Sequence, residues 1–193
     1  MDAVRYYVLH EIPFANDGNL TYDLLEERYN SDLANVLGNL VNRTISMNKK
    51  YFDNIVVTSD VTDSIDKDLI NTVLGAKAKV EKCMSDLKVA DAIDEVFNIF
   101  KRCNKYIDET TPWILAKEEN KDRLKCVIYN LLESIRIGAV LLYPFLPQTS
   151  EEIFKQLNTD ETSYESIIEF GKLKIGNTLN DPKPLFIRIE KEK

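Results

Sequence analysis

The sequence contains no long hydrophobic run. Its longest apolar stretch, residues 137–146, is interrupted by Gly138 and Pro144, whereas a helix that spans a bilayer needs about 20 mostly apolar residues. The amino-terminal residues also lack the charged, apolar and small-residue regions that make up a signal peptide. We therefore expect a soluble, cytoplasmic protein with no membrane partner.

Residues that carry catalytic or metal-binding chemistry are scarce. There is one histidine, His10, and the three cysteines, Cys83, Cys103 and Cys126, show no paired spacing. A zinc site needs closely spaced cysteine or histidine pairs, and a di-iron carboxylate bundle needs two E-x-x-H motifs. The six glycines are scattered and form no phosphate-binding loop. We expect no metal site, cofactor or catalytic residue in this chain, and we expect the cysteines to be buried as small apolar residues.

The charge balance limits the kind of nucleic acid that the protein can bind. The formal net charge is −7, and proteins that coat nucleic acids bind phosphates through an excess of Lys and Arg. We therefore expect no DNA partner. Recognition of a few unpaired RNA bases remains open, because stacking and hydrogen bonds to base edges carry that selectivity.

Apolar residues recur at helical spacing through most of the chain. Hydrophobic residues make up 44% of the sequence, which is enough for a core. The pattern predicts an all-α fold, an antiparallel helical bundle. The predicted helices cover residues 2–11, 22–52, 66–85, 88–109, 121–143 and 149–156.

The regions between these helices carry recognisable breaking signals. Residues 12–19 contain a proline and an Asn-Asp-Gly run, which predict a loop, and Thr21 can cap the helix that follows. A kink is expected at residues 30–32, because Asn, Ser and Asp side chains compete for backbone hydrogen bonds. The end of the chain is predicted to be irregular, apart from an alternating segment at 185–189 that predicts a single strand.

Two polar side chains lie beside the apolar stripe of the predicted helix 22–52. Asn39 and Arg43 are four residues apart, which places them about 40° apart on one helix face. In a structural interpretation, this pair caps a neighbouring helix or binds a carboxylate. In a functional interpretation, the pair faces a ligand.

The only tryptophan, Trp113, follows Pro112 where a helix is predicted to end. Its indole ring has a large π face and one N–H donor, so it can fill a core or form an exposed stacking platform. For an isolated tryptophan, burial is the commoner outcome. Without further information, the sequence therefore favours a buried ring.

Four segments together resemble the anticodon-binding domain of methionyl-tRNA synthetases. They are residues 2–19 (DAVRYYVLHEIPFANDGN), 30–44 (NSDLANVLGNLVNRT), 104–117 (NKYIDETTPWILAK) and 136–153 (RIGAVLLYPFLPQTSEEI), and the closing LFIRIE at 185–190 is similar to the family's last segment. The resemblance covers almost the whole chain. It implies a bundle of the class I aminoacyl-tRNA synthetase anticodon-binding type at residues 20–193, with an irregular tail. Residues 1–19 would then be the end of the connecting, or stem-contact, region.

This resemblance implies recognition of the CAU anticodon of tRNA(Met). In that family an upstream catalytic domain, with HIGH and KMSKS signatures and a zinc knuckle, attaches methionine to the tRNA with ATP. Neither signature occurs here, so we expect a fragment that is not catalytic alone and that lacks its amino-terminal catalytic domain, where ATP and zinc would bind. Two alternatives remain open: a helical protein-interaction bundle, and the anticodon domain of another class I synthetase.

The resemblance also assigns roles to individual residues. In the family, the first anticodon base stacks on the tryptophan of the P-W turn, and the Asn and Arg of G-N-L-x-x-R read that base. The matching residues are Trp113, Asn39 and Arg43. Asn104 and Asp108 match polar and acidic positions that serve the other two bases and disfavour wrong anticodons.

One position departs from the expected pattern. Lys101 lies one turn before Lys105, where the resemblance leads us to expect an acidic residue. Rejection of wrong anticodons by charge repulsion is therefore not expected from this position. Lys101, Arg102 and Lys105 are instead expected to hold phosphates, which would allow local RNA binding by an acidic protein.

Overall fold

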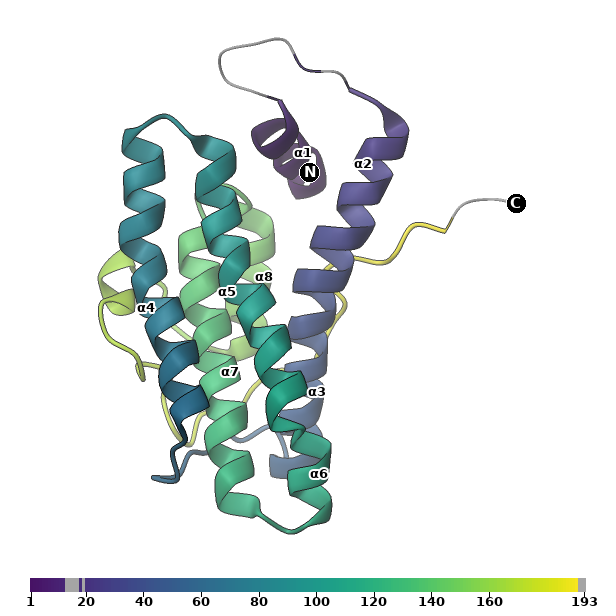
Figure 1. The fold of residues 1–193 in the computed structure, drawn as a ribbon. Helices are drawn as coiled ribbons and strands as arrows, with labels where there is room; N and C mark the ends of the chain where they lie inside the picture. Colours follow the sequence, from purple (N-terminus) through teal and green to yellow (C-terminus); the bar gives the residue numbers. More distant parts are fainter. Residues whose placement is uncertain (13–17, 19, 191–193) are drawn as a thin grey trace.

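The computed structural model describes residues 1–12, 18 and 20–190, which form helices joined by short turns (Figure 1). The predicted all-α fold is confirmed for these residues, because their only β contact is an isolated antiparallel bridge between Ile55 and Thr178. Except for Ile12 and Gly18, the predicted loop at 12–19 lies outside the described residues. The helices are α1 (Asp2–Glu11), α2 (Tyr22–Arg28), η1 (Tyr29–Gly38), α3 (Asn39–Phe52), α4 (Ser64–Ser85), α5 (Val89–Thr110), α6 (Pro112–Lys117), α7 (Lys121–Leu142), α8 (Pro147–Leu157) and η2 (Tyr164–Ile167).

Three helices of equal length, α4, α5 and α7, form the body of the bundle, and each has 22 residues. α7 contacts α3, α4, α5, α6 and α8, and almost all of its side chains are buried, so it is the central helix (Figure 1). Gly138 lies where α7 meets α5. A Cβ atom there would lie 2.5 Å from Cε1 of Phe100, so the close approach of the two helices requires glycine.

The helices begin at capping side chains. Oγ1 of Thr21 accepts a hydrogen bond from the backbone N–H of Leu24 at 3.3 Å, as predicted. α4 begins at Ser64, earlier than predicted, because Asp63 and Asp66 form a reciprocal capping box. In that box the backbone N–H of Asp63 donates to Oδ2 of Asp66 at 2.8 Å.

The kink predicted at residues 30–32 is replaced by a change of helix type. Residues Tyr29–Gly38 form a π-helix between α2 and α3, so the helix from Tyr22 to Phe52 is continuous. Asp32 does not cap a new turn. Its carboxylate accepts hydrogen bonds from the Ser31 hydroxyl at 3.1 Å and from the Tyr6 hydroxyl at 2.9 Å. The Tyr6 contact ties the long helix to α1.

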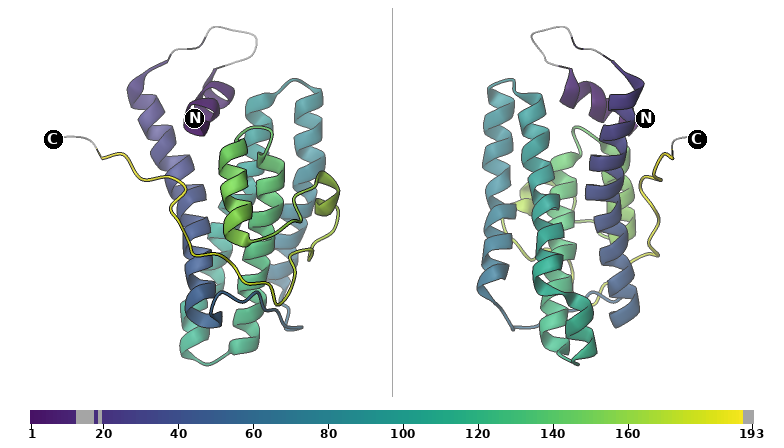
Figure 2. Two further views of the ribbon diagram at one scale, coloured as in Figure 1. Left: turned by 180° about the vertical axis from the view of Figure 1, so that it is seen from behind. Right: turned by 45° about the vertical axis from the view of Figure 1, so that its right-hand side comes forward.

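The strand predicted at 185–189 is wrong. The chain beyond η2 runs as an irregular segment past α8 and the long helix (Figure 2). A strand needs a neighbouring strand for its hydrogen bonds, and here a side chain takes that place. The Asn30 amide donates to the carbonyl of Ile189 at 3.0 Å and accepts from its N–H at 2.9 Å. The aromatic rings of Phe186 and Tyr29 meet edge to face, with their centroids 5.7 Å apart.

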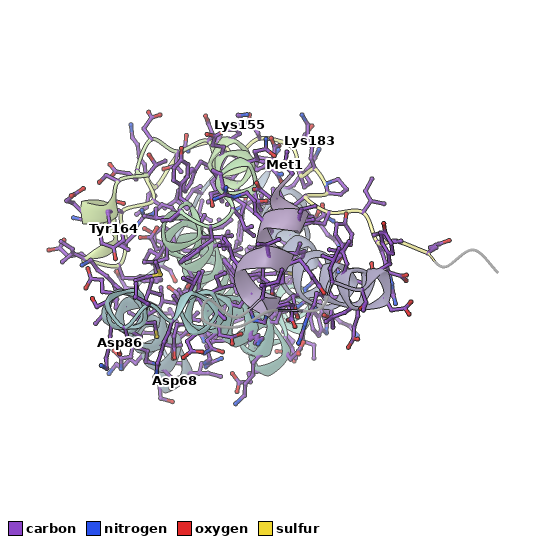
Figure 3. The ribbon with its side chains drawn as sticks, turned by 90° about the horizontal axis from the view of Figure 1, so that it is seen from above. Met1, Asp68, Asp86, Lys155, Tyr164 and Lys183 are labelled. Carbon is purple, nitrogen blue, oxygen red and sulfur yellow. The ribbon has the colours of Figure 1, made fainter. Side chains whose placement is uncertain are left out.

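Charged side chains cover the outside of the bundle (Figure 3). Asp68 and Asp86 lie on the flank formed by α4, and Lys155 and Lys183 lie where the irregular segment passes α8. Where the irregular segment passes α8, the Gln156 side chain of α8 donates to the carbonyl of Lys183 at 3.0 Å and accepts from its N–H at 3.1 Å. Within the described ranges, no helix combines the length and the apolar character needed to cross a membrane.

Candidate nucleic-acid interface

Asn39 and Arg43 lie on α3 directly after the π-helix. The Asn39 side chain is exposed, and its amide donates to Oδ1 of Asn35 at 3.3 Å. Arg43 is half-buried, and its Nη2 donates to Oδ1 of Asn104 on α5 at 3.2 Å. Among the described residues, neither side chain caps a neighbouring helix or pairs with a carboxylate. The partners required by the structural interpretation are therefore missing from that part of the chain.

The positive charge of Arg43 is not neutralised by the described residues. The group that holds its guanidinium is a neutral amide, and its Nε is buried with no hydrogen-bond partner there. A buried donor without a partner costs free energy, and a guanidinium has only donors to offer. Arg43 therefore keeps one buried donor without a hydrogen-bond partner and a charge that no carboxylate of the described residues neutralises.

Asn104 uses both ends of its amide inside the protein. Its Nδ2 donates to the carbonyl of Val36 in the π-helix at 3.0 Å and to the carbonyl of Phe100 at 3.1 Å. These two bonds fix the orientation of the amide, so that its oxygen faces Arg43. A π-helical turn is wider than an α-helical turn and is frequent at functional sites. Here the π-helix supplies a carbonyl group that anchors the neighbour of Arg43.

Trp113 lies in the first turn of α6, at the end of the bundle towards which α3 and α5 run (Figures 1 and 2). Its side chain is 47% exposed. The preceding Pro112 is buried at the first position of α6, where proline is favoured because its ring already has helical φ. The expectation of a buried ring, which the sequence alone favoured, is therefore wrong.

Asp108 is exposed one turn after Asn104, near the end of α5. The basic residues beside it differ in availability. Arg102 is only 11% exposed, and it donates to Asp68 at 2.7 Å and to Glu109 at 3.0 Å. Its donors are used by carboxylates, which argues against the phosphate contact expected for it. Lys101 is exposed, and the exposed Lys105 lies 3.5 Å from Glu109.

A buried polar network lies behind this end of α5. Arg123 of α7 donates to both oxygens of Asp66 of α4, at 2.6 and 2.8 Å. The hydroxyl of Tyr106 donates to Oδ1 of the same carboxylate at 2.5 Å. Burial alone would raise the pKa of Asp66, but these hydrogen bonds hold it below its usual value. Burial and the neighbouring Asp66 raise the pKa of the Tyr106 hydroxyl, so both groups keep their ordinary protonation states.

Sequence reasoning did not find this network. The spacing of Asp63 and Asp66 is a capping signal that could have identified Asp66 as a residue at a helix start. No local signal connects Asp66 with Arg123, because the two residues are far apart in the sequence and meet only after α4 and α7 pack together.

The described residues provide no set of ligands for a metal ion. They contain no group of three or more His, Cys, Asp and Glu side chains that could hold one. Cys103 and Cys126 are buried, as expected, while Cys83 is only half-buried, and all three are free thiols. His10 stacks on Tyr6 with ring centroids 5.1 Å apart and lies 2.7 Å from Glu11, so it is a packed side chain.

The fold is similar to that of solved methionyl-tRNA synthetases. The apo form of Mycobacterium tuberculosis methionyl-tRNA synthetase superposes with a TM-score of 0.92 at 30% sequence identity, over 99% of this chain and 39% of the other. The same enzyme bound by methionyl-adenylate gives a TM-score of 0.91 at 30% identity, over 96% of this chain and 37% of the other. The predicted bundle type is therefore confirmed.

Two family models match the sequence. Residues 57–193 match the anticodon binding domain of methionyl tRNA ligase, and residues 1–45 match class I tRNA synthetases (M). The chain therefore belongs to the family of anticodon-binding domains of methionyl-tRNA ligases. This result excludes the alternative of an anticodon domain from another class I synthetase.

Curated relatives agree with this family. Methionine–tRNA ligase of Clostridium tetani (strain Massachusetts / E88) is 49% identical over 192 residues, which are 99% of this chain. Methionine–tRNA ligase of Bacillus subtilis (strain 168) is 43% identical over 197 residues and covers the whole chain. In both cases the match covers only 30% of the relative's length.

Proposed function

We propose that this domain reads the CAU anticodon of tRNA(Met), with Trp113, Asn39 and Arg43 binding its first base. The observation that carries the proposal is the guanidinium of Arg43, which among the described residues is held by the neutral amide of Asn104 and not by a carboxylate. The exposed ring of Trp113 supports it. An exposed aromatic ring can stack on an unpaired base, while donor groups select the base by its edge.

The chemistry of these side chains suits cytosine. Stacking on Trp113 contributes binding energy, on the order of 1–3 kcal/mol per base, but does not distinguish one base from another. Arg43 donates to the ring acceptors of cytosine, and Asn39 orients this contact or accepts from the amino group. Uracil presents a donor in place of one acceptor, and the mismatched polar groups cost about 1–3 kcal/mol.

Asn104 and Asp108 belong to the proposed site in different ways. Asn104 holds Arg43 through its amide oxygen, and its place beside the other anticodon bases remains a prediction from the family resemblance. Asp108 is exposed one turn away. Its carboxylate would accept from a base amino group and repel acceptor groups, which disfavours wrong anticodons.

The activity of a whole enzyme is a further part of the proposal. The relatives are methionine–tRNA ligases about three times as long as the matched region, and we propose that this chain serves an enzyme that attaches methionine to tRNA(Met) with ATP. The described residues hold no metal-ligand group, and the sequence has no phosphate-binding loop. We propose that ATP and zinc are bound by a catalytic domain that corresponds to the part of the relatives that this chain does not match. Such an enzyme acts in the cytoplasm.

The catalytic domain is the proposed protein partner, and an apolar patch on α1 supports this. Val4 and Val8 of α1 are 53% and 43% exposed. Residues 1–45 match the class I synthetase model. We therefore propose that α1 is where the bundle contacts the catalytic domain. We propose that residues 1–19 are the end of the connecting region and that residues 20–193 are the bundle.

The proposal is tested with two RNA stem-loops that differ in one base. We expect the 193-residue chain to bind a stem-loop with a CAU loop weakly, and to bind the UAU loop about tenfold more weakly or not at all. Fluorescence or calorimetric titration measures both dissociation constants. Equal affinity for the two loops would contradict base-specific reading.

The role of Trp113 is tested in the same assay. We expect Trp113→Ala to abolish binding of the CAU loop and to leave the helical circular dichroism spectrum almost unchanged, because the ring is half exposed. Tyr22→Ala is the matched control, since Tyr22 is 86% exposed on α2 and lies outside the proposed site. A collapse of helicity in Trp113→Ala would show that the ring supports the core instead.

A further inference from the structure

We propose that Thr111 is a positioning residue for Trp113: its left-handed backbone fixes the corner between α5 and α6 and holds the indole ring outside the bundle. The inference rests on the proposed function of Trp113 and deepens it. Thr111 lies between α5 and α6. It is not one of the residues proposed to bind the base, and it acts on the site through the position of Trp113.

The backbone of Thr111 has φ of 42° and ψ of 63°. For a β-branched residue this left-handed conformation is a genuine outlier, because the side chain crowds the backbone. The residue before a proline is further restricted, and normally adopts an extended conformation. Such strain persists only where the surrounding structure enforces it, and it is frequent at binding sites.

Thr111 is the single residue between two helices. Its N–H donates to the carbonyl of Ile107 at 2.9 Å, which closes the last turn of α5. Its carbonyl accepts from the N–H groups of Ile114 at 2.8 Å and Leu115 at 3.3 Å, which opens α6. The direction of α6 therefore depends on the two torsion angles of one residue. The Thr111 side chain makes no capping hydrogen bond, so its role lies in the backbone.

The structure on both sides of this corner is anchored. Before it, the Thr110 hydroxyl donates to the carbonyl of Tyr106 at 2.6 Å, and the Tyr106 hydroxyl binds Asp66 of α4. After it, Arg123 in the first turn of α7 binds the same carboxylate. The end of α5 and the start of α7 are thus tied to one acidic residue of α4. None of these three bonds involves α6, so the direction of α6 between the two anchored ends depends on the corner at Thr111.

The test replaces Thr111 by glycine and by asparagine. Glycine removes the crowding and adopts many conformations, so Thr111→Gly loosens the corner without removing a side-chain hydrogen bond. Asparagine tolerates the left-handed region better than other residues with a Cβ, so Thr111→Asn keeps the corner fixed. Because Trp113 is the only tryptophan, its fluorescence anisotropy reports the motion of this ring directly, without RNA.

Leu87→Gly provides a matched control. Leu87 also has a left-handed backbone, with φ of 57°, and lies in the turn between α4 and α5 at the opposite end of the bundle (Figure 1). We expect all three variants to keep the helical circular dichroism spectrum of the unmodified chain. Only Thr111→Gly should lower the anisotropy of Trp113 and raise the dissociation constant of the CAU stem-loop, by about fivefold.

Three results would overturn the inference: unchanged anisotropy and affinity in Thr111→Gly, an equal loss of affinity in Leu87→Gly, or a loss of helicity in Thr111→Gly. The last result would assign Thr111 to the stability of the fold and not to the position of the ring. Failure of the proposed function is distinguishable, because the unmodified chain would then bind the CAU and UAU loops equally, while the anisotropy would still test Thr111.

Discussion

Arg43 is held in place by a neutral side chain, and this keeps its positive charge available. A carboxylate at the position of Asn104 would fix the guanidinium more strongly, but it would also neutralise the charge that a base or phosphate would meet. The amide of Asn104 is in turn oriented by two backbone carbonyls, those of Val36 and Phe100. The residue that selects the base in the proposed site is therefore positioned through a chain of uncharged groups.

Replacement of Arg43 by lysine tests the importance of the guanidinium. Lysine keeps the charge but loses the planar set of donors, so we expect Arg43→Lys to bind the CAU loop about tenfold more weakly and to lose discrimination against UAU. Arg102→Lys is the control, because the donors of Arg102 are already used by Asp68 and Glu109. If both variants bind equally well, Arg43 contributes only charge.

At the residue scale, the sequence indicated candidate site residues, but it did not indicate how exposed they are or which residues they contact. Asn39, Arg43 and Trp113 could be named in advance, because helix periodicity and the family pattern depend on local sequence. The exposure of Trp113 could not be predicted from composition, which favours burial. The contact between Arg43 and Asn104 joins residues 61 positions apart, and it exists only because α3 and α5 pack together.

At the level of helices, the ion pair of Asp66 and Arg123 makes stability depend on pH. The pKa of Asp66 lies below its usual value in the folded chain, so its contribution is present above the unfolded pKa of about 3.9 and is lost as the pH falls through the folded value. We expect Asp66→Asn to lower the free energy of unfolding by about 3 kcal/mol at pH 7. The difference between the variant and the unmodified chain should shrink as the pH approaches the folded pKa.

Urea denaturation at several pH values measures this effect. Asp181→Asn is the control, because the pKa of Asp181 is also lowered, by a hydrogen bond from Lys49, but its side chain is 68% exposed. Exposed ion pairs contribute little to stability, so this variant should resemble the unmodified chain at all pH values. A constant difference between Asp66→Asn and the unmodified chain down to strongly acidic pH would contradict the assignment.

Helix boundaries could be predicted where a nearby side chain caps the helix. They could not be predicted where packing against other helices sets the boundary. Thr21 was recognised as a cap, and α5, α7 and α8 lie within two residues of their predicted limits. The π-helix at Tyr29–Gly38 escaped prediction, because its contacts with α5 and the hydrogen bond from Tyr6 of α1 to its Asp32 join segments far apart in the sequence. α6 was missed because a helix of six residues carries almost no periodic signal.

For the whole molecule, one buried ion pair on α7 holds residues 161–173, where the carboxyl-terminal part of the chain first crosses the bundle. The Glu133 carboxylate accepts from Arg136 at 2.8 Å and from the backbone N–H groups of Gly171, Lys172 and Leu173 at 2.9–3.1 Å. Arg136 is fully buried and donates to the carbonyls of Glu161 and Ser166. The alternating pattern at 185–189 suggested a strand, but attachment to helices replaces pairing with a second strand.

Glu133→Gln tests this attachment. An amide group would face the three N–H donors and leave Arg136 without its counter-charge, so we expect a loss of about 3–5 kcal/mol in the free energy of unfolding. Hydrogen exchange should rise most in residues 161–173. Glu169→Gln is the control, since Glu169 is 71% exposed and pairs only with Lys172 among the described residues. Protection that is equal in both variants would show that other contacts hold the segment.

The equal length of α4, α5 and α7 also sets the length of the bundle along its helix axes. At about 1.5 Å per residue, helices of 22 residues span about 33 Å. Trp113 lies at one end of this span, and α1 lies at the other (Figure 1). The bundle therefore separates these two ends by about the length of one helix. In the proposed function the anticodon loop binds at the Trp113 end, so any contact that α1 makes with the catalytic domain lies about 33 Å away from that loop.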